Sequence, residues 1–287
     1  TFLKFLKMIC RVFCFLAIFL ISSTATFAQD SLYVKLDGKN RVKELGTLRN
    51  GEKHGLFFKY KNNGKHKSFI YENGKKRKLA TSEVTTEKKY DPKSKGQILE
   101  ESFGILKDGK RDGLWLTFNN NNIFITASMY NAGVLEGTNY DFHPDGEVRR
   151  IEHYKNGEKH GSCKEFHAGG ALHYNMQYVN GKVIDGNVIY FYPNGNKKIV
   201  NSFKNGYKSG KSTTYYESGA VEIEGEYRGK GTPEGPWKEY YENGTLKEEY
   251  YYKHGLFHGE YNIYDENGKV LEQYIYRNDK LIKTIRN

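Results

Sequence analysis

The sequence is poor in proline and cysteine and, beyond its first residues, has no long hydrophobic run. Only 5 of its 287 residues are proline and 3 are cysteine, whereas 31 are glycine and 24 are tyrosine. Disordered chains lack the large side chains that offset the entropy cost of ordering, so this composition indicates a folded protein. A mean hydropathy of −0.77 predicts a soluble rather than an integral membrane protein.

The first residues have the layout of a secretory signal peptide. Lys4, Lys7 and Arg11 precede an apolar run over residues 12–21, and small residues lead to Ala28. A membrane-spanning helix needs about 20 apolar residues, and this run is about half as long, so a cleaved signal is favoured over an anchor. We therefore expect residues 1–28 to be removed. The mature chain is expected to be periplasmic, associated with the outer envelope, or secreted.

Export would leave one cysteine and a basic chain. Cys10 and Cys14 lie in the expected signal peptide, so only Cys163 remains, and packing rather than disulfides must stabilise the fold. The net charge is +11, or +8 without the three cations of the signal peptide. This excess can favour an anionic surface, although interspersed Lys and Glu are typical of a solvated surface.

Glycine recurs every 24 or 25 residues along most of the chain, which is the mark of a repeat protein. One glycine series runs from Gly113 to Gly259, a second precedes it by four residues in most units, and a third follows it by nine. Many of these glycines follow Asn or Asp, and such dipeptides tolerate the positive φ angles of tight hairpins. We predict structural turn glycines at Gly109, Gly113, Gly133, Gly137, Gly146, Gly157, Gly161, Gly195, Gly206, Gly210, Gly244, Gly255, Gly259 and Gly268.

Aromatic residues recur with the same period. A first column, four residues before the third glycine position, is expected to form an aromatic ladder of Tyr60, Phe118, Phe142, Phe166, Phe191, Tyr215, Tyr240 and Tyr264. A second column contains Tyr154, Tyr178, Phe203, Tyr227, Tyr252 and Tyr276. A third, mostly apolar column contains Phe57, Trp115, Asn139, Cys163, Val188, Ser212, Trp237 and Tyr261. Its spacing of three from the first column requires either a bulge or rings on both faces of the sheet.

Each unit is predicted to be a β-hairpin that cannot fold alone. About 24 residues lose on the order of 36 kcal/mol of chain entropy, while each buried ring returns about 2 to 3 kcal/mol. Neighbouring units must cover each other's rings, which predicts an all-β, elongated, single-layer antiparallel meander of stacked hairpins. We expect repeats over residues 29–74, a degenerate repeat or basic inserted loop over 75–95, and a regular array with a C-terminal cap over 96–287.

The phrase YYENGTLKEEYYYKHGLFHGEYNIYDENGK, beginning at residue 240, resembles tandem MORN repeats of the bacterial variant type. YKNGEKHG, FYPNG, FKNGYKSG and EGPWKEYYENG have the same pattern of an aromatic residue, an Asn-Gly turn and a second aromatic. The resemblance covers about residues 36–287, apart from 75–95. It implies stacked hairpins that act chiefly as scaffolds; some family members are reported to bind acidic phospholipids, and many bacterial ones are labelled antitoxin components.

No residue pattern points to catalysis. HExxH, GxSxG and GxxxxGK[ST] are absent, so the familiar enzymatic routes lack a starting residue. His54, His160 and His258 share one repeat position, but they lie too many units apart to converge on a metal. Cys163 is expected to be a small buried group rather than a reactive thiol. We expect no cofactor and no metal.

The chain is therefore predicted to be an exported, non-enzymatic scaffold for protein–protein interaction at the cell envelope. One alternative is binding of anionic lipid or envelope polysaccharide, for which an aromatic ladder would have to be exposed to stack on sugars. Another is an antitoxin or immunity function. Nucleic acid is not expected as a partner, because the basic residues do not cluster on one motif and export removes the chain from nucleic acid.

Overall fold

The computed structural model describes residues 31–38, 41–60, 66–72, 74–78, 84–93, 97–121 and 123–286. These residues form strands and no helix, so the all-β fold class is confirmed. The expected signal peptide, residues 1–28, lies outside the described residues. In the part of the chain that is described, no helix has the length and apolar character needed to cross a membrane.

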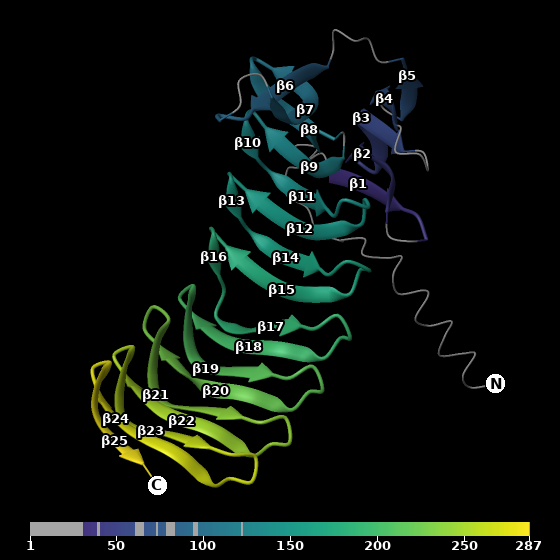
Figure 1. Ribbon diagram of the computed structural model, residues 1–287. Helices are drawn as coiled ribbons and strands as arrows, with labels where there is room; N and C mark the ends of the chain where they lie inside the picture. The colour runs from purple at the N-terminus through teal and green to yellow at the C-terminus, as the bar shows by residue number, and fades with distance from the viewer. Residues whose placement is uncertain are drawn as a thin grey trace, which may run out of the picture.

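The strands form two antiparallel sheets (Figure 1). The N-terminal sheet contains β1 (Ser31–Leu36), β2 (Val42–Arg49), β3 (Glu52–Tyr60), β4 (His66–Glu72) and β5 (Lys75–Arg77). The first half of the main sheet contains β6 (Thr85–Tyr90), β7 (Ile98–Lys107), β8 (Lys110–Asn119), β9 (Phe124–Asn131), β10 (Val134–Leu135), β11 (Gly137–Phe142), β12 (Val148–Lys155), β13 (Glu158–Lys159), β14 (Gly161–Phe166), β15 (Leu172–Val179) and β16 (Lys182–Val183). The second half contains β17 (Gly186–Phe191), β18 (Lys197–Lys204), β19 (Tyr207–Tyr215), β20 (Val221–Arg228), β21 (Thr232–Tyr240), β22 (Leu246–Lys253), β23 (Leu256–Tyr264), β24 (Val270–Arg277) and β25 (Lys280–Arg286).

The main sheet is the predicted meander. Each long strand pairs antiparallel with the strands before and after it, as β8 does with β7 and β9 and as β23 does with β22 and β24. The terminal strands β6 and β25 pair with β7 and β24, and they lie at opposite ends of the sheet in Figure 1. Consecutive hairpins therefore stack along one axis, as in other repeat arrays.

The turn glycines adopt a backbone conformation that other residues rarely enter. All fourteen have positive φ, between 67° and 96°. At several turns the preceding residue is also left-handed, for example Asn156 and Asn205 with φ of 52° and 55°. Two successive positive φ angles define the hairpin turn that matches the natural twist of the strands. The Asn-Gly and Asp-Gly pairs therefore direct the chain reversals.

Both faces of the main sheet carry rings. On β8, Trp115 and Phe118 are three residues apart, and the register shift adds its extra residue to β9 rather than to β8. Between Trp115 and Phe118 the alternation along β8 is therefore unbroken, and the two side chains point to opposite faces. The register shift of β8 against β7 lies earlier, between Asp112 and Leu116. Phe118 joins a buried core with Leu114 and Leu116, whereas Trp115 lies outside that core.

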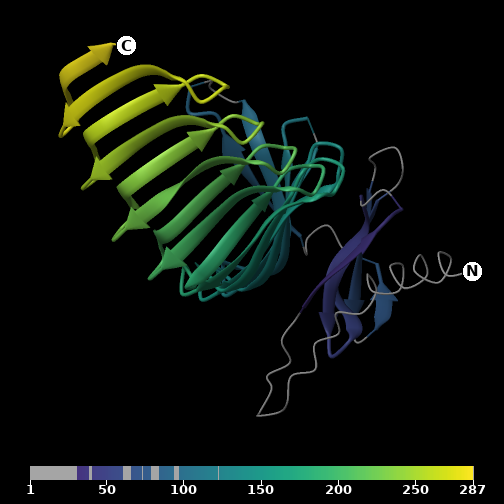
Figure 2. The same cartoon turned by 90° about the horizontal axis from the view of Figure 1, so that it is seen from below.

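The N-terminal sheet packs on one face of the main sheet near its start (Figure 2). Leu45, Leu56 and Phe58 from β2 and β3 share one core with the Leu116 face of β8 and its neighbours. The β1–β2 connection also reaches the β11–β12 turn, where Arg41 forms an isolated bridge with Glu147. The meander itself is one layer, as predicted, but over its first repeats it has a second layer that the sequence did not indicate.

A weak seam divides the main sheet. In the described strands, β15 and β17 are in register at Tyr174 and Tyr190 alone, whereas Ile199, Val200 and Asn201 of β18 are all in register with β19. The turn at this seam has one extra residue between Gly181 and Gly186. The sheet also changes direction between β15 and β17 in Figure 1. The insertion therefore loosens the pairing between two halves of the array.

Candidate binding surfaces

We call the face that bears the third column the closed face, defined by Trp115, Cys163, Val188 and Trp237. Large side chains on this face lie over small ones on the preceding strand. The ring of Trp115 lies 2.3 Å from the place where a Cβ on Gly104 would stand, and Trp237 lies 2.2 Å from that of Gly225. These rings require glycine beneath them. The volume of each tryptophan side chain is therefore matched by the missing side chain on the preceding strand.

A charged network occupies the closed face between β11 and β15. Arg150 Nη2 lies 2.6 Å from Asp141, and Lys159 Nζ lies 2.7 Å from Glu152. Burial alone would raise the pKa of Glu152, but the Lys159 hydrogen bond and the charge of Arg150 outweigh it and leave that pKa below its ordinary value. Every charge named here has an opposite partner, which is what a buried ion pair needs to persist.

Cys163 lies within this network but has the properties of a structural thiol. Its side chain is buried, and Sγ lies 3.7 Å from Glu152 Oε1. Burial, followed by the negative charge of Glu152, raises the pKa of the thiol to about 11. A nucleophilic cysteine needs a lowered pKa and access to solvent, so Cys163 is poorly suited to covalent chemistry near neutral pH.

The histidines that share one repeat position belong to separate units. His54 lies on β3, His160 lies between β13 and β14, and His258 lies on β23, where its Nδ1 is 3.2 Å from Asn278 Oδ1. Within the described ranges, no group of three or more His, Cys, Asp or Glu is arranged to hold a metal.

Other units place an acid at this histidine position, and its carboxylate accepts a hydrogen bond from the next turn. Glu136 accepts from the backbone N–H of Asn156 at 2.7 Å, and Asp185 accepts from that of Asn205 at 2.7 Å. Glu234 accepts from His254 in the same way. The position therefore links consecutive turns along one edge of the array.

The opposite edge is linked by a column that the sequence analysis missed. Tyr192, Tyr216 and Tyr241 each donate a hydroxyl hydrogen bond of 2.7–2.8 Å to a backbone carbonyl in the next unit. His143 and His167 occupy the same position and lie 3.2 Å and 2.9 Å from the equivalent carbonyls. The signal was present, because these residues directly follow the first aromatic column in each unit.

The predicted ladder does not form one continuous stack. Tyr60 lies on β3 of the N-terminal sheet, with its ring 5.5 Å from that of Phe124 on the main sheet. Phe118 and Phe142 are buried beside Phe124. The later members Phe166, Phe191, Tyr215, Tyr240 and Tyr264 are half-buried on the main sheet.

The face opposite the closed face is covered near β8 and is uncovered at Lys164 of β14 and through the second half of the array. We call its uncovered part the open face, defined by Lys164, Lys211, Glu224, Lys238, Glu249 and Asn262. Its side chains form local pairs: Lys211 Nζ lies 3.2 Å from Glu224, and Tyr264 donates to Glu249 at 2.6 Å. This face is polar and largely accessible, with Thr213 and Asn262 buried within it.

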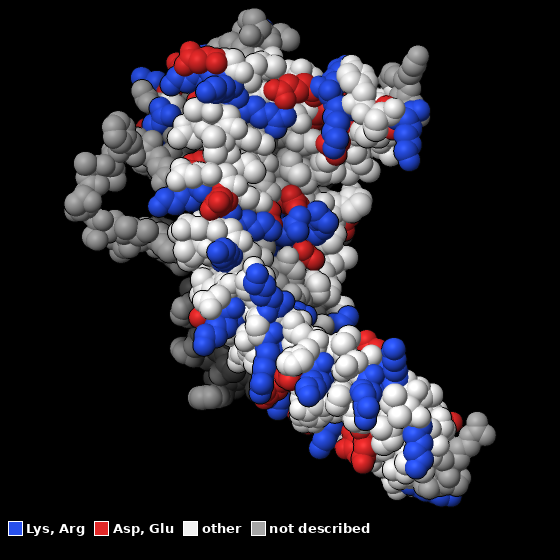
Figure 3. Space-filling view, turned by 90° about the vertical axis from the view of Figure 1, so that its left-hand side faces the viewer, with Lys and Arg blue, Asp and Glu red and all other residues white. Residues whose placement is uncertain are grey.

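The two long edges of the main sheet differ in charge. The basic edge contains the turns at residues 107–111, 131–135, 155–159, 179–183, 204–208, 228–232, 253–257 and 277–281. Figure 3, which faces this side of the molecule, shows Lys and Arg recurring along the array with fewer acids between them. The turns of this edge carry thirteen cations against the acids Asp108, Glu158 and Asp279, and the carboxylates of Glu136, Asp185 and Glu234 also contact these turns. The cations are Lys107, Lys110, Arg111, Lys155, Lys159, Lys182, Lys204, Lys208, Arg228, Lys230, Lys253, Arg277 and Lys280.

The opposite edge is acidic. Its turns at residues 143–147, 167–171, 192–196, 216–220, 241–245 and 265–269 contain the cation Lys269 and the acids Asp145, Glu147, Glu217, Glu242, Asp265 and Glu266. Exposed large apolar side chains, in contrast, gather in the basic-edge turns or within one residue of them, at Leu106, Val134, Val179, Ile184, Tyr207, Leu256, Leu281 and Ile282. The basic edge is therefore amphipathic.

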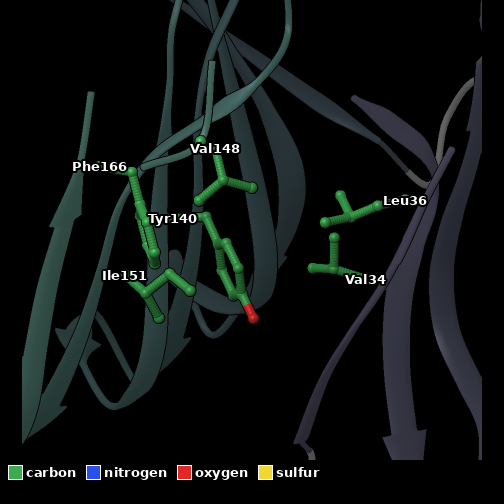
Figure 4. A pocket seen from close by; sticks show the side chains of 7 residues that line it. Val34, Leu36, Tyr140, Val148, Ile151 and Phe166 are labelled. Atoms are coloured by element: carbon green, nitrogen blue, oxygen red, sulfur yellow. The ribbon is translucent and has the colours of Figure 1, made fainter. Parts of the chain in front are cut away.

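A small apolar cleft lies between the two sheets (Figure 4). It has a volume of about 220 Å³, and Val34 and Leu36 of β1 face Tyr140, Ile151 and Phe166 of the main sheet across it. Its walls continue the core that joins the sheets. We regard it as an incompletely filled part of that interface.

Comparisons with known proteins identify the repeats. The MORN repeat variant matches residues 135–156, 184–205, 208–228, 233–254 and 257–278. No curated protein matches the sequence. Partial similarity extends to solved structures, which include a crystal structure of TcdB2-TccC3-Cdc42 (11% identity, TM-score 0.18) and the Photorhabdus luminescens Tc holotoxin pore (12% identity, TM-score 0.15).

Those alignments cover 84% and 85% of this chain but only 17% of each matched chain, and their TM-scores are too low to support an argument about fold or function. The repeat matches are different, because all five copies, four of them consecutive, coincide with hairpins seen in the structure. MORN repeat proteins are generally non-enzymatic scaffolds, and many of them bind partners. The chain belongs to the MORN repeat family.

Proposed function

We propose that this protein is an exported, non-enzymatic scaffold whose open face binds a protein at the cell envelope. The observation that carries the proposal is the uncovered open face in the second half of the array. There the turns repeat, but the side chains between them differ from unit to unit, as at Ile189, Thr213 and Lys238. A rigid backbone with variable side chains is a common basis for recognition by repeat proteins.

The proposed export rests on the sequence of residues 1–28, which has the three parts of a secretory signal. The low cysteine content is compatible with this proposal, because the fold is held by packing and hydrogen bonds. An envelope fraction is therefore the first place to search for a partner.

The proposal can be tested by capture from envelope extracts with two charge-matched variants. Lys164→Glu/Lys211→Glu alters exposed positions of the open face, and Lys182→Glu/Lys204→Glu makes the same charge change on the basic edge. We expect a protein partner that is retained at about 0.5 M salt, where exposed charges are screened. The open-face variant should lose this partner and the edge variant should keep it. Equal capture by both variants would contradict the proposal.

A second candidate function, binding to an anionic lipid surface, is favoured by the basic edge. Exposed apolar side chains alternate there with cations, as Val179 does with Lys182 and as Leu256 does with Lys253. Apolar groups that enter the headgroup region, flanked by cations, are typical of proteins that lie on anionic membranes.

Vesicles distinguish this candidate from the first. The protein should sediment with vesicles that contain half phosphatidylglycerol and half phosphatidylcholine, and not with phosphatidylcholine alone. Each cation near such a surface contributes about 1 kcal/mol, so Lys182→Glu/Lys204→Glu should weaken binding at least about thirtyfold. Lys164→Glu/Lys211→Glu serves as the control and should bind as the unmodified protein does. Binding that survives high salt in the edge variant would contradict this candidate.

A further inference from the structure

One position on the open face departs from its column in the repeat. The equivalent residues of the other main-sheet units are Met129, His153, Gln177, Ser202, Glu226 and Ile275, and this unit places a tyrosine, Tyr251, in that column. Its cross-strand partner, Pro236, replaces a polar residue in the same way. Tyr251 is 42% exposed, and its hydroxyl makes no hydrogen bond with the described residues. A repeat that breaks its pattern without a structural benefit marks a candidate functional position.

Tyr251 borders a groove across β21, β22 and β23. The groove has a volume of about 440 Å³, and its lining includes Pro236, Lys238, Glu249 and Glu260. Gly259 also lines the groove, and a Cβ built there would meet nothing within 4 Å. An exposed ring therefore stands beside a backbone surface that a flat ligand can approach.

The polar side of the groove is held in place before any ligand arrives. Asn262 Nδ2 donates to Glu249 Oε1 at 3.1 Å, and Gln273 Nε2 donates to Asn262 Oδ1 at 3.1 Å. Lys238 and Glu260 form no ion pair within the described part of the chain, so their charged groups are available. Preorganised donors and acceptors reduce the entropy cost of binding a small ligand.

We propose that this groove binds a neutral pyranose unit of a glycan, with Tyr251 as the stacking platform. A pyranose presents an apolar face of C–H groups and a rim of hydroxyls, which matches an aromatic plane beside carboxylate, amide and ammonium groups. Glu249 and Glu260 outnumber Lys238, so an acidic glycan or a nucleic acid would be repelled. The inference depends on the accessible open face and not on a protein partner or a lipid surface.

The test is a titration of the full-length chain with cellohexaose and with tetra-N-acetylchitotetraose, followed by chemical shifts or tyrosine fluorescence. At least one oligomer should bind with a dissociation constant of about 1 mM or tighter. Tyr251→Ala should weaken this binding about tenfold or more, and Tyr251→Phe should retain it because the ring remains. Added salt at about 0.5 M should have little effect, since the ligand is neutral.

Tyr207→Ala is the matched control, because Tyr207 is 44% exposed but lies on the basic edge. It should bind the oligomer as the unmodified protein does. The inference would be overturned if neither oligomer bound, or if Tyr251→Ala bound as tightly as Tyr207→Ala. Circular dichroism of both variants would verify that the exposed substitutions leave the fold intact.

Discussion

The two halves of the main sheet use the same hairpin but differ in what covers the face opposite the closed face. Around β8 this face is apolar and lies beneath the N-terminal sheet, with Leu116 fully buried. Beyond the seam at β15–β17 the equivalent positions hold the half-buried Ile189 and the polar residues Thr213, Lys238 and Asn262. The closed face, in contrast, is filled in both halves. The closed face and the turns therefore build the repeat, and the other face is free to vary.

The largest effect should come from removing a closed-face ring. Trp115 is 1% exposed, its Nε1 donates to the carbonyl of Ile105 at 3.2 Å, and Arg111 stacks over it. Trp115→Ala should cost about 3–5 kcal/mol of unfolding free energy, measured by chemical denaturation. Trp237→Ala is the comparison in the uncovered half. Its Nε1 has no hydrogen-bond partner in the described part of the chain, so the loss should be smaller.

A second prediction separates the covered and uncovered faces. Leu116 and Lys164 occupy the same column, but only Leu116 lies under the N-terminal sheet. Leu116→Ala should destabilise the protein by about 2–5 kcal/mol. Lys164→Ala should change the stability by less than about 0.5 kcal/mol, as expected for an exposed site. Similar losses from both changes would mean that the N-terminal sheet does not pack on this face in solution.

A third prediction tests whether the closed face is equivalent in both halves. Gly104→Ala and Gly225→Ala would each place a methyl group within 2.3 Å of a tryptophan ring atom. Each should cost about 1–3 kcal/mol through overpacking. The two losses, compared in one denaturation series, should be similar. A large loss of unfolding free energy from Gly104→Ala alone would show that the uncovered half of the sheet accommodates the added methyl group more easily.

The smallest effect concerns the charged network of the first half. The pKa of Glu152 is lower in the folded protein than in the unfolded chain, since Lys159 and Arg150 outweigh the effect of burial. Ionised Glu152 therefore adds stability above its ordinary pKa, and this contribution is lost as the pH falls through the lowered folded value. Glu152→Gln should lose less stability than the unmodified protein between about pH 6 and pH 3. The measurement is the unfolding free energy of both proteins across this pH range. If the two free energies fell by the same amount, the ionisation of Glu152 would not be coupled to folding.

Much of the fold could be read from the sequence because it is local. Asn-Gly and Asp-Gly pairs specify turns through their own backbone preferences, so Gly157 and Gly206 could be placed without knowledge of any neighbour. The period of 24 or 25 residues then specified the stacking. The position of the N-terminal sheet could not be read, because Leu45 and Phe58 look like ordinary strand residues until Leu116 and Phe142 face them.

The binding surfaces were less predictable for a related reason. The basic edge arises from turn residues that are 24 or 25 positions apart, so the sequence shows interspersed charges where the structure shows a row. The third column left two alternatives open, and only the position of the extra residue on β9 showed that rings occupy both faces. Tyr251 was hidden among neighbouring tyrosines until strand pairing separated exposed positions from packed ones.

The tyrosine links between units also constrain how such a protein can evolve. Each hydroxyl of Tyr192, Tyr216 and Tyr241 reaches a carbonyl 23 or 24 residues farther along the chain. A deletion of a few residues inside one unit would misalign the donors on both sides of it. Duplication or loss of a whole unit would leave every remaining donor opposite an acceptor. Such a chain can therefore change its length only by whole repeat units if these hydrogen bonds are to be kept.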